Sequence, residues 1–563
     1  MSGWLRPLLA ALAFAGVVVW FGGLLVQAQV IEGEAYAARS LRSRAKVETV
    51  PAARGKLLDR NGKVLAQDVV RWTAVLAEDA PEESRVRLAQ LCREEDVAWD
   101  GTGAVQGVTA RLLARGKEEG LAGVTFVPAV ERVGSGTLAP HVLGRVGAMS
   151  AEEWAVFQAA GYAMNETVGK DGAEAAFEAE LHGTPGRRYV ETGQDGSVSA
   201  DGWDVAPVPG RNVTLTLDKR LQETAQTALA DFLAEHPNAG GGAVVALDAT
   251  DGGVLAMASL PGYDPAVFSA QYPALAQDEG HPLMNRATQG LYAPGSVFKL
   301  VTAAAALETG VLTPETKILD TGRYTYYKTP QPQCWLYRQA GQTHGLETVT
   351  QAIADSCNIF FYDAGRRVGI ETLETYARAL GLGEKTGLEL AGEKAGVVAG
   401  PAYTRSIGGT WYEGSVLSAA IGQENHRFTP LQLAHMTALL VGGGGQVHLL
   451  KQVAGEAPQE AERPEGVRLS EENLTAIKEG MRAVTQSGSL AEAFAGLPVT
   501  AGAKTGSAQV AGEEESNAVL VCFAPYEQPK IALALVAEQG GSGAALGDAA
   551  AAILRAWAET NLS

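Results

Sequence analysis

Cysteine is scarce in this chain, and that scarcity limits the classes of protein to which it can belong. Among 563 residues, the only cysteines are Cys92, Cys334, Cys357 and Cys522. Four cysteines are far too few for a disulfide-stapled scaffold, and none of them lies in a CxxC pair. The redox compartment therefore has to be inferred from the membrane topology.

An excess of basic charge is absent as well. The chain has 45 Lys and Arg residues against 64 Asp and Glu residues, which gives a net charge of −19. Phosphate backbones repel a body this acidic, so we expect no nucleic-acid partner. Extensive disorder is also disfavoured, because apolar residues make up 46% of the chain and charged residues only 19%.

A long apolar run stands near the N-terminus. Residues 7–26 (PLLAALAFAGVVVWFGGLLV) carry no charge, and their number matches the ~20 residues that a helix needs to cross a bilayer. A cleavable signal peptide is the alternative, with Val26-Gln27-Ala28 as its cleavage site, but its apolar region is usually only ~7–15 residues long. We therefore expect a short tail and a retained anchor at 1–28. The charges on either side leave its orientation open.

The rest of the chain is long enough for two domains, because single cores stop growing at roughly 250–300 residues. Residues 29–205 are predicted to form an elongated mixed α/β pedestal. A linker with two prolines and a glycine (VAPVPGRN, 205–212) leads into a second domain over 206–563. In the pedestal, Asn61-Gly62 predicts a hairpin within 54–67. Helices are expected at 82–95 and 105–116 and within 168–186.

The second domain is predicted to be α+β. The pattern favours a hairpin of 243–249 with 254–259, and two further apolar strands at 517–525 and 530–538. A helix is expected at 547–559. Strands at both ends of the domain with helices between them predict one sheet that is assembled from distant segments.

A serine and a lysine stand three residues apart at the start of a predicted helix. In YAPGSVFKLVTAAAAL (292–307), Ser296 and Lys299 project from one helix face. Serine needs a base to act as a nucleophile, and a buried lysine amine held neutral can supply one. The N–H of Ser296 is also suited to stabilise an oxyanion. SxxK alone is a weak pattern, because residues 43–46 (SRAK) fit it too, and that copy is interpreted as a solvated segment after the anchor.

Two further short patterns follow downstream. Ser356 and Asn358 bracket Cys357 in an apolar helical run, where they can reach Lys299 and a substrate carbonyl; alone, this triplet is better explained as a polar turn. The tripeptide KTG occurs twice, at 385–387 and at 504–506. The first copy is interpreted as a connection from a helix to a loop. The second, Lys504-Thr505-Gly506, lies in a strand of small residues, which another backbone can approach closely. The N–H of Ser507 then offers a second oxyanion donor.

The order SxxK, SxN and KTG is similar to that of the penicilloyl-serine transferases, the penicillin-binding proteins and serine β-lactamases. The segments RGKLLDRNGKVLA, HVLGRVG, VGKDGAEAAFEAELHGTPG and IGQENHRFTPLQLA resemble class B penicillin-binding proteins. The resemblance runs from the anchor to about residue 545. β-Lactamases lack the anchor and the pedestal, and class A proteins carry an added glycan-polymerase domain.

The resemblance implies a transpeptidase domain of the penicillin-binding/serine β-lactamase type, with an antiparallel sheet flanked by helices, above a dimerisation-type pedestal. It implies that Ser296 is the acyl-accepting nucleophile and Lys299 the general base, with Ser356 and Asn358 as proton relay and substrate clamp. Residues Lys504, Thr505, Gly506 and Ser507 would recognise the donor peptide. The substrate would be the D-Ala-D-Ala stem peptide of peptidoglycan, and β-lactams would acylate the same serine.

The resemblance also implies a cytoplasmic N-terminus, a single span and an extracytoplasmic catalytic body. A glycan polymerase of the SEDS family (shape, elongation, division and sporulation) is the partner expected by analogy. Two other functions use the same serine, a penicillin-sensing receptor and a β-lactamase-like hydrolase. Sensors usually have several spans, and the anchored pedestal disfavours a hydrolase.

A possible metal site lies between the first two patterns. Asp320, Cys334, His344 and Cys357 all have side chains that bind zinc. Some elongation-type penicillin-binding proteins resemble this arrangement in carrying an Asp/His/Cys zinc site, with Cys334 standing here in place of a carboxylate. The alternatives are a Cys334–Cys357 disulfide, or a Cys357 that is simply a small buried residue. No cofactor is required for the acyl-transfer chemistry, so zinc would be structural. The other histidines show no HExxH or paired spacing and are interpreted as structural or surface residues.

Overall fold

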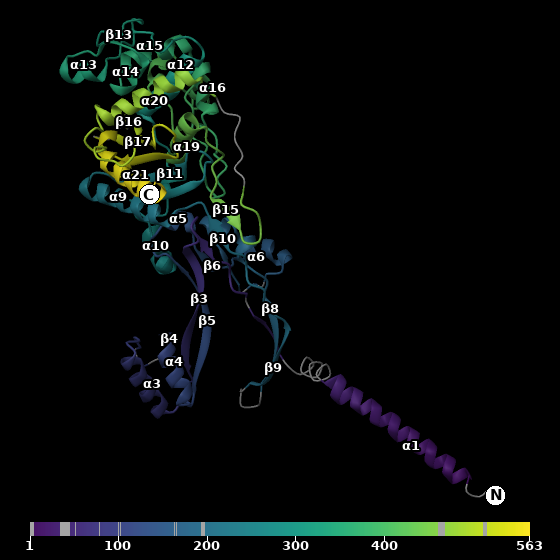
Figure 1. The fold of residues 1–563 in the computed structure, drawn as a ribbon. Helices are drawn as coiled ribbons and strands as arrows, with labels where there is room; N and C mark the ends of the chain where they lie inside the picture. The colour runs from purple at the N-terminus through teal and green to yellow at the C-terminus, as the bar shows by residue number, and fades with distance from the viewer. Residues whose placement is uncertain are drawn as a thin grey trace. The chain divides into compact units, whose positions relative to one another are not determined.

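The structure is a computed structural model (Figure 1). It describes residues 5–33, 46–50, 52–77, 79–99, 101, 103–162, 164, 166–192, 198–459, 468–509 and 515–562. The SRAK copy of the SxxK pattern begins at Ser43, outside these described residues. The chain divides into two compact units, of which the first comprises 1–55, 149–166 and 181–211, and the second 56–148, 167–180 and 212–563.

The first unit contains the anchor helix and a small sheet. Helix α1 (Leu5–Val26) continues into the π-helical turn η1 (Gln27–Ile31). In the described part of the chain, Leu8–Ile31 is the one stretch long and apolar enough to cross a membrane, and none of it is buried against the protein. Strands β1 (Lys46–Val50), β8 (Gly186–Thr192) and β9 (Val198–Val205) form an antiparallel sheet, accompanied by α6 (Ala151–Phe157) and η2 (Gln158–Ala160).

The second unit begins with a sheet in the order β15-β10-β2-β3-β4, in which β5 also pairs with β3. Its strands are β2 (Leu57–Leu58), β3 (Val64–Leu76), β4 (Val105–Val108), β5 (Val124–Gly134), β10 (Val213–Leu215) and β15 (Leu450–Val453). The predicted hairpin at Asn61-Gly62 is confirmed: β2 and β3 pair in antiparallel fashion, and Gly62 has a φ of 81°. Helix α3 (Glu82–Glu94) confirms the prediction at 82–95.

The expected helix at 105–116 is wrong in its first half. Residues 105–108 form β4, and helix α4 (Ala110–Glu118) begins only after Thr109. The Thr109 side chain accepts a hydrogen bond from the backbone N–H of Leu112, which is N-cap geometry. Strand β4 is favoured over another helical turn because Val105 and Val108 are buried while its backbone pairs with β3.

The turn at 59–62 is tied to the start of the second domain. Asp59 Oδ1 accepts hydrogen bonds from the backbone N–H groups of Asn61 and Lys63. The Asn61 amide donates to Asp218 Oδ2, and Asp218 is the N-cap of α9 (Lys219–Glu235). The DRNG sequence therefore has a structural purpose, because it links the β2–β3 hairpin to α9.

The predicted sheet assembled from distant segments is confirmed, with the order β12-β11-β18-β17-β16 and antiparallel pairing throughout. Its strands are β11 (Gly241–Asp248), β12 (Val254–Leu260), β16 (Gly502–Ala508), β17 (Asn517–Ala524) and β18 (Ile531–Glu538). Helices α9 and α21 (Gly547–Asn561) cover one face, and α19 (Pro430–Gly442) packs on the other (Figure 1).

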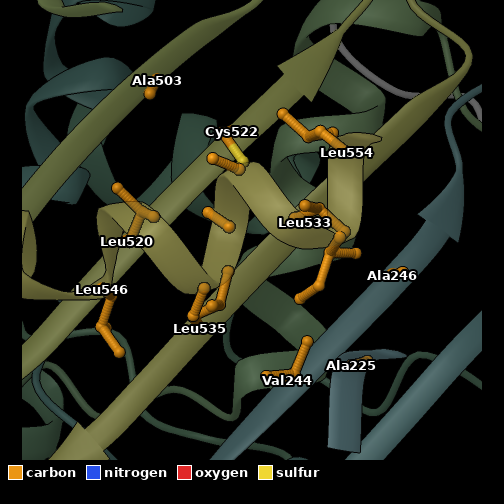
Figure 2. Packing of buried hydrophobic residues seen from close by; sticks show 14 of the residues in the cluster. Ala225, Val244, Ala246, Ala503, Leu520, Cys522, Leu533, Leu535, Leu546 and Leu554 are labelled. Carbon is orange, nitrogen blue, oxygen red and sulfur yellow. The ribbon is translucent and has the colours of Figure 1, made fainter. Parts of the chain in front are cut away.

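Burial on both faces explains why the central strands read as continuous apolar runs. Val244, Leu520, Leu533 and Leu535 point into the cluster shared with Leu554 of α21 (Figure 2). The alternate residues of β17 and β18 are equally buried, because helices cover both sides of the sheet. Removing such surface from water is worth roughly 25 cal/mol per Å², so this core holds the strands in register for the site at the β16 edge.

A largely helical region between β12 and β15 completes the domain. Its elements are η3 (Pro265–Val267), α10 (Phe268–Leu275), α11 (Arg286–Gln289), η4 (Gly295–Phe298), α12 (Lys299–Glu308), β13 (Ile318–Asp320), α13 (Trp335–Ala340), β14 (Gly345–Glu347), α14 (Val349–Ala354), α15 (Asn358–Val368), α16 (Ile370–Ala379), α17 (Pro401–Ser406) and α18 (Ser415–Ala420). Helix α20 (Glu471–Gln486) and η5 (Gly543–Leu546) follow later in the chain. The remaining described elements of the pedestal are α5 (Pro140–Leu143), β6 (Val146–Ala148), β7 (Thr167–Gly169), α7 (Gly172–Ala176) and α8 (Glu178–Leu181).

Candidate active site

Ser296 lies in a tight turn at the entrance to α12. It belongs to the 3-10 turn η4, and Lys299 is the first residue of the α-helix that follows. Side chains three residues apart align in a 3-10 turn. Ser296 and Lys299 therefore project on the same side of the chain, as predicted. They do so from a 3-10 turn and the helix that follows it, and not from a single α-helix. The Ser296 side chain is partly exposed, whereas Lys299 is completely buried.

The amine of Lys299 is held by the second sequence pattern. It donates to the backbone oxygen of Ser356 at 2.7 Å, to the Ser356 hydroxyl at 3.1 Å and to Asn358 Oδ1 at 2.7 Å. Burial lowers the pKa of Lys299 to about 8, against the opposing influence of nearby Cys357 and Cys334. A lysine with such a pKa has a neutral fraction at physiological pH and can act as a base.

The SxN residues form a sharp turn between α14 and α15 rather than part of one continuous helix. Ser356 has a φ of 54°, a left-handed conformation that is uncommon for a residue other than glycine. Cys357 is the N-cap residue of α15, and Asn358 begins that helix. The hydrogen bonds to Lys299 hold this conformation in place, and strained backbone of this kind gathers at functional sites.

Lys504 approaches the same hydroxyl from strand β16. Its amine donates to Ser356 Oγ at 3.0 Å and to the backbone oxygen of Thr505 at 3.0 Å. Burial, together with the positive charge of Lys299, lowers the pKa of Lys504 well below its usual value. The Ser356 oxygen thus accepts hydrogen bonds from both lysines. Its own proton remains available for donation to a third group.

Strand β16 packs closely against the turn that carries Ser296. A Cβ atom on Gly506 would lie 2.6 Å from the backbone oxygen of Pro294, and one on Gly295 would lie 2.9 Å from that of Ser507. Both positions therefore require glycine, and Gly295 additionally has a φ of 54°. This close approach brings the backbone of Ser296 beside the backbone of Ser507, as two oxyanion donors require.

The other edge of β16 is open to an extended ligand. Among the described strands, β16 pairs only with β17 and ends the five-stranded sheet. Thr505 and Ser507 are the members of the strand that keep solvent exposure, whereas Lys504 and Gly506 are buried. An added peptide strand can pair with such an edge through main-chain hydrogen bonds.

The four predicted metal ligands come together beside the SxN turn. The ligand atoms of Asp320, Cys334, His344 and Cys357 all lie within 4.8 Å of one another. His344 Nδ1 is 2.7 Å from Asp320 Oδ2 and 3.5 Å from Cys334 Sγ. The N–H of Asn358 donates to Cys334 Sγ at 3.3 Å, which connects this cluster directly to the SxN turn. Both cysteines are free thiols in the structure.

The charges in this cluster are strongly coupled. A hydrogen bond from the Cys357 thiol lowers the pKa of Cys334, despite the opposing cost of burial. Burial opposes protonation of His344, but hydrogen bonds to Cys334 and Asp320 outweigh it and raise its pKa to about 9. The cluster thus favours negative charge on Cys334 and Asp320 beside the ring of His344.

Models of two known families match most of the chain. The penicillin-binding protein transpeptidase domain matches residues 242–559, and the penicillin-binding protein dimerisation domain matches residues 49–215. The chain belongs to the class B penicillin-binding proteins. The matched transpeptidase region contains every residue of the three sequence patterns and all four members of the metal-ligand cluster. The predicted boundary at 205/206 stays a prediction.

Named relatives of this penicillin-binding protein agree with the family models. Peptidoglycan D,D-transpeptidase MrdA of Escherichia coli strain K12 is 30% identical over 592 aligned residues, covering 96% of this chain and 92% of the relative. MrdA of Acinetobacter baumannii is 30% identical over 574 aligned residues, covering 94% of this chain and 84% of the relative.

Solved structures give the same result for the fold. One chain of "Structural coordination of polymerization and crosslinking by a peptidoglycan synthase complex" superposes with a TM-score of 0.80 at 34% identity, covering 99% of this chain and 98% of that chain. The penicillin-binding protein (PBP2) in its complex with MreC from Helicobacter pylori gives 0.74 at 26% identity, covering 92% of this chain and all of that chain.

Sequence reasoning missed one buried residue of this penicillin-binding protein. Glu347 in β14 is 2% exposed, and burial raises the pKa of its carboxyl to about 7. Its neighbours include Cys357 and His344. The sequence held a cue in LETV (346–349), two residues after His344. In this short stretch Glu347 alternates with Leu346, and an acidic residue on the covered face of a short strand is unusual.

Proposed function

We propose that this penicillin-binding protein is a membrane-anchored peptidoglycan D,D-transpeptidase that cross-links stem peptides through an acyl-enzyme on Ser296. The observation that carries the proposal is the shared contact of Ser356 Oγ with the amines of Lys299 and Lys504, next to the turn that bears Ser296. Three polar groups from distant segments meet there although their burial is costly. Such an arrangement is expected where protons are moved.

In the acylation step, Ser296 Oγ attacks the carbonyl carbon of the D-Ala-D-Ala peptide bond. The neutral amine of Lys299 takes the hydroxyl proton, and the N–H groups of Ser296 and Ser507 stabilise the negative oxygen that forms. The proton then passes through Ser356 to the departing nitrogen, and the C–N bond breaks. The terminal D-Ala leaves as a free amine, and the donor peptide remains as an ester of Ser296.

In the second step, an amine of a neighbouring stem peptide attacks this ester. The amine loses a proton to the same relay, the C–O bond to Ser296 breaks, and the serine recovers its proton. Lys504 sits where it favours an anionic donor group, and the open edge of β16 binds the donor as an added strand. β-Lactams acylate Ser296 by the same first step, but the ring nitrogen that is expelled stays covalently attached to the adduct, so it does not leave the site to make room for an acceptor.

The apolar α1 helix supports a single-pass membrane anchor. Its orientation, with a short cytoplasmic N-terminus and an extracytoplasmic catalytic body, is proposed from the family to which the chain belongs. We also propose a glycan polymerase of the SEDS family as partner. The similarity to a chain of a peptidoglycan synthase complex that couples polymerisation and cross-linking supports this partnership.

Asp320, Cys334, His344 and Cys357 fit a structural zinc ion. Their donor set of two sulfurs, one nitrogen and one oxygen suits tetrahedral zinc, and their atoms are already gathered within 4.8 Å. Bound zinc would fix the fold of this loop region and would neutralise part of its negative charge. Through the adjacent Ser356 and Asn358, the four ligands would hold the SxN turn in position.

Metal analysis of the full-length protein, purified in mild detergent with its thiols kept reduced, tests this zinc site. We expect one zinc per chain and four reactive thiols after denaturation and chelation. A chain free of metal, or one in which Cys334 and Cys357 are joined by a disulfide in the active protein, would end the zinc proposal.

Labelling with a fluorescent penicillin tests the proposed catalytic function. Wild type should form a stable covalent adduct, and Ser296→Ala should form none. The alternative functions predict different results: a β-lactamase-like hydrolase would release the label rapidly, and a scaffold that only uses the fold for binding would not label. A penicillin-sensing receptor would label stably but fail to release D-Ala from a stem peptide.

A further inference from the structure

The hairpin that carries part of the metal-ligand cluster has one inward and one outward face. Strands β13 and β14 pair so that Leu319 lies opposite Leu346, and both side chains are 56% exposed. Successive side chains of a strand point to opposite faces. The neighbouring residues Asp320 and Glu347 therefore share the inward face, where each is only 2% exposed.

Two polar groups on this inward side make no hydrogen bond of full geometry in the described part of the protein, although the Cys357 thiol and the Asp355 carboxyl lie close enough to one of them, Glu347, to shift its pKa. The two groups are the carboxylate of Glu347, at both of its oxygens, and Nε2 of His344. Each is buried and each acts electrostatically on the other. Leaving a buried polar group unpaired costs about 1–3 kcal/mol, so two such groups three residues apart require an explanation.

The contacts of His344 define which of its nitrogens faces the metal position. Nδ1 is the atom near Asp320 and Cys334, so a bound ion would take the lone pair of Nδ1. The ring proton must then reside on Nε2, which becomes a buried donor. In metal sites, the second ring nitrogen of a ligating histidine commonly donates to a carboxylate, which fixes the ring orientation and strengthens the ligand.

We propose that Glu347 is the acceptor for the Nε2–H of His344, and is thus a positioning residue of the metal site. The inference rests on the proposed zinc ion, and it assigns a purpose to the inward-facing polar side chain of this hairpin that is not a ligand; the other inward-facing non-ligand, Ile318, is apolar. The Glu347 side chain has three torsions by which its carboxyl can turn towards Nε2 of His344. The pairing satisfies both orphaned groups at once.

Zinc affinity of the full-length protein, measured by chelator competition, tests the proposal. Loss of an outer carboxylate typically weakens metal binding by 10–100-fold, and we expect Glu347→Ala to fall in that range. Glu347→Gln should lose less, because its amide oxygen still accepts from Nε2–H but carries no charge. Glu393→Gln is the matched control: Glu393 is also buried, but it accepts from Thr386 and lies outside the cluster. Its zinc affinity should stay within about twofold of wild type.

The rise in Tm on adding zinc gives a readout that a purely structural role would not change. If Glu347 acts through His344, the rise shrinks in Glu347→Ala, whereas a structural defect lowers the Tm of the metal-free and zinc-loaded forms equally. Wild-type zinc affinity in both Glu347 variants would overturn the inference, and so would a wild type that binds no zinc. Penicillin labelling of Ser296 in the same samples reports on the transpeptidase proposal separately, because that chemistry does not pass through the metal.

Discussion

The two KTG tripeptides have identical residues and opposite settings. Lys504 lies in β16, is 1% exposed and donates to the hydroxyl of Ser356. Lys385 lies in the loop after α16, and its side chain is exposed to solvent. In the first copy, Gly506 permits close contact with the turn that bears Ser296. In the second copy, Gly387 has a φ of 87°, so its glycine is needed for the backbone conformation of the loop.

The difference teaches that burial, not the tripeptide, makes the lysine chemically useful. Burial makes the charged form of Lys504 costly and lowers its pKa, and the hydroxyl of Ser356 and the carbonyl of Thr505 accept hydrogen bonds from its amine. At Lys385 the amine remains hydrated, and Thr386 instead fixes the loop by two hydrogen bonds to Glu393. A solvated amine such as that of Lys385 is not held in a fixed position by the protein, so it cannot stabilise a substrate by preorganised electrostatics.

The largest expected contrast comes from replacing each lysine. Lys504→Ala removes the preorganised amine that donates to Ser356 Oγ, so the rate of penicillin acylation should fall by roughly 10³. Lys385→Ala should label at the wild-type rate. Stopped-flow or gel-based labelling of both variants measures the contrast, with circular dichroism as the control for folding. Equal effects in the two variants would contradict the assignment.

Replacing the hydroxyl that joins the two lysines should have the next largest effect. Ser356→Ala removes the oxygen that accepts from Lys299 and Lys504, and relay groups of this kind contribute about 10²–10⁴ in rate. We expect slower acylation and also slower loss of D-Ala from a stem-peptide substrate. If Ser356→Ala acylates as fast as wild type, the relay through this hydroxyl is wrong.

The pH dependence should distinguish the buried lysines from the exposed one. Burial lowers the pKa of Lys299 to about 8, and only its neutral form accepts the proton of Ser296. The acylation rate should therefore rise about tenfold per pH unit below about 8 and level off above it. Lys385→Ala should leave this profile unchanged. A rate independent of pH between 6 and 8 would exclude Lys299 as the base.

The smallest effect is expected in the loop of the second KTG copy. Thr386→Val removes the hydroxyl that donates to Glu393 at 2.7 Å, which should reduce the free energy of unfolding by about 1–2 kcal/mol. Penicillin labelling at 25 °C should not change. Chemical denaturation and labelling of the same preparation measure the two quantities. If Thr386→Val slowed penicillin labelling without lowering the free energy of unfolding, the loop would take part in catalysis, which would contradict this prediction.

Much of the fold follows from local patterns in the sequence. The strands at 517–524 and 531–538 are apolar throughout because both faces of the sheet are covered, and the Asn-Gly turn fixes the β2–β3 hairpin. The helix expected at 105–116 is wrong in its first half because pairing of β4 with β3 outweighs local helix propensity. Strand order in the five-stranded sheet depends on contacts between segments hundreds of residues apart.

Which residues meet beside Ser296 was predictable from the sequence, whereas the geometry in which they meet was not. The family resemblance implies catalytic roles for Ser296, Lys299 and Lys504. No local pattern shows that the backbone of Ser356 is left-handed, or that its hydroxyl oxygen accepts hydrogen bonds from both lysines. Glu347 was missed because its purpose depends on which face of a three-residue strand is covered, and that is decided by tertiary packing.

Mapping the acyl group after reaction with a stem-peptide thioester tests the central claim most directly. Full-length protein is quenched in acid during turnover, digested and analysed by tandem mass spectrometry. We predict that the donor acyl group is on the Ser296 hydroxyl, and that adding an amine acceptor transfers it from the enzyme to that amine. An acyl group on another residue, or turnover with no covalent adduct, would contradict the account.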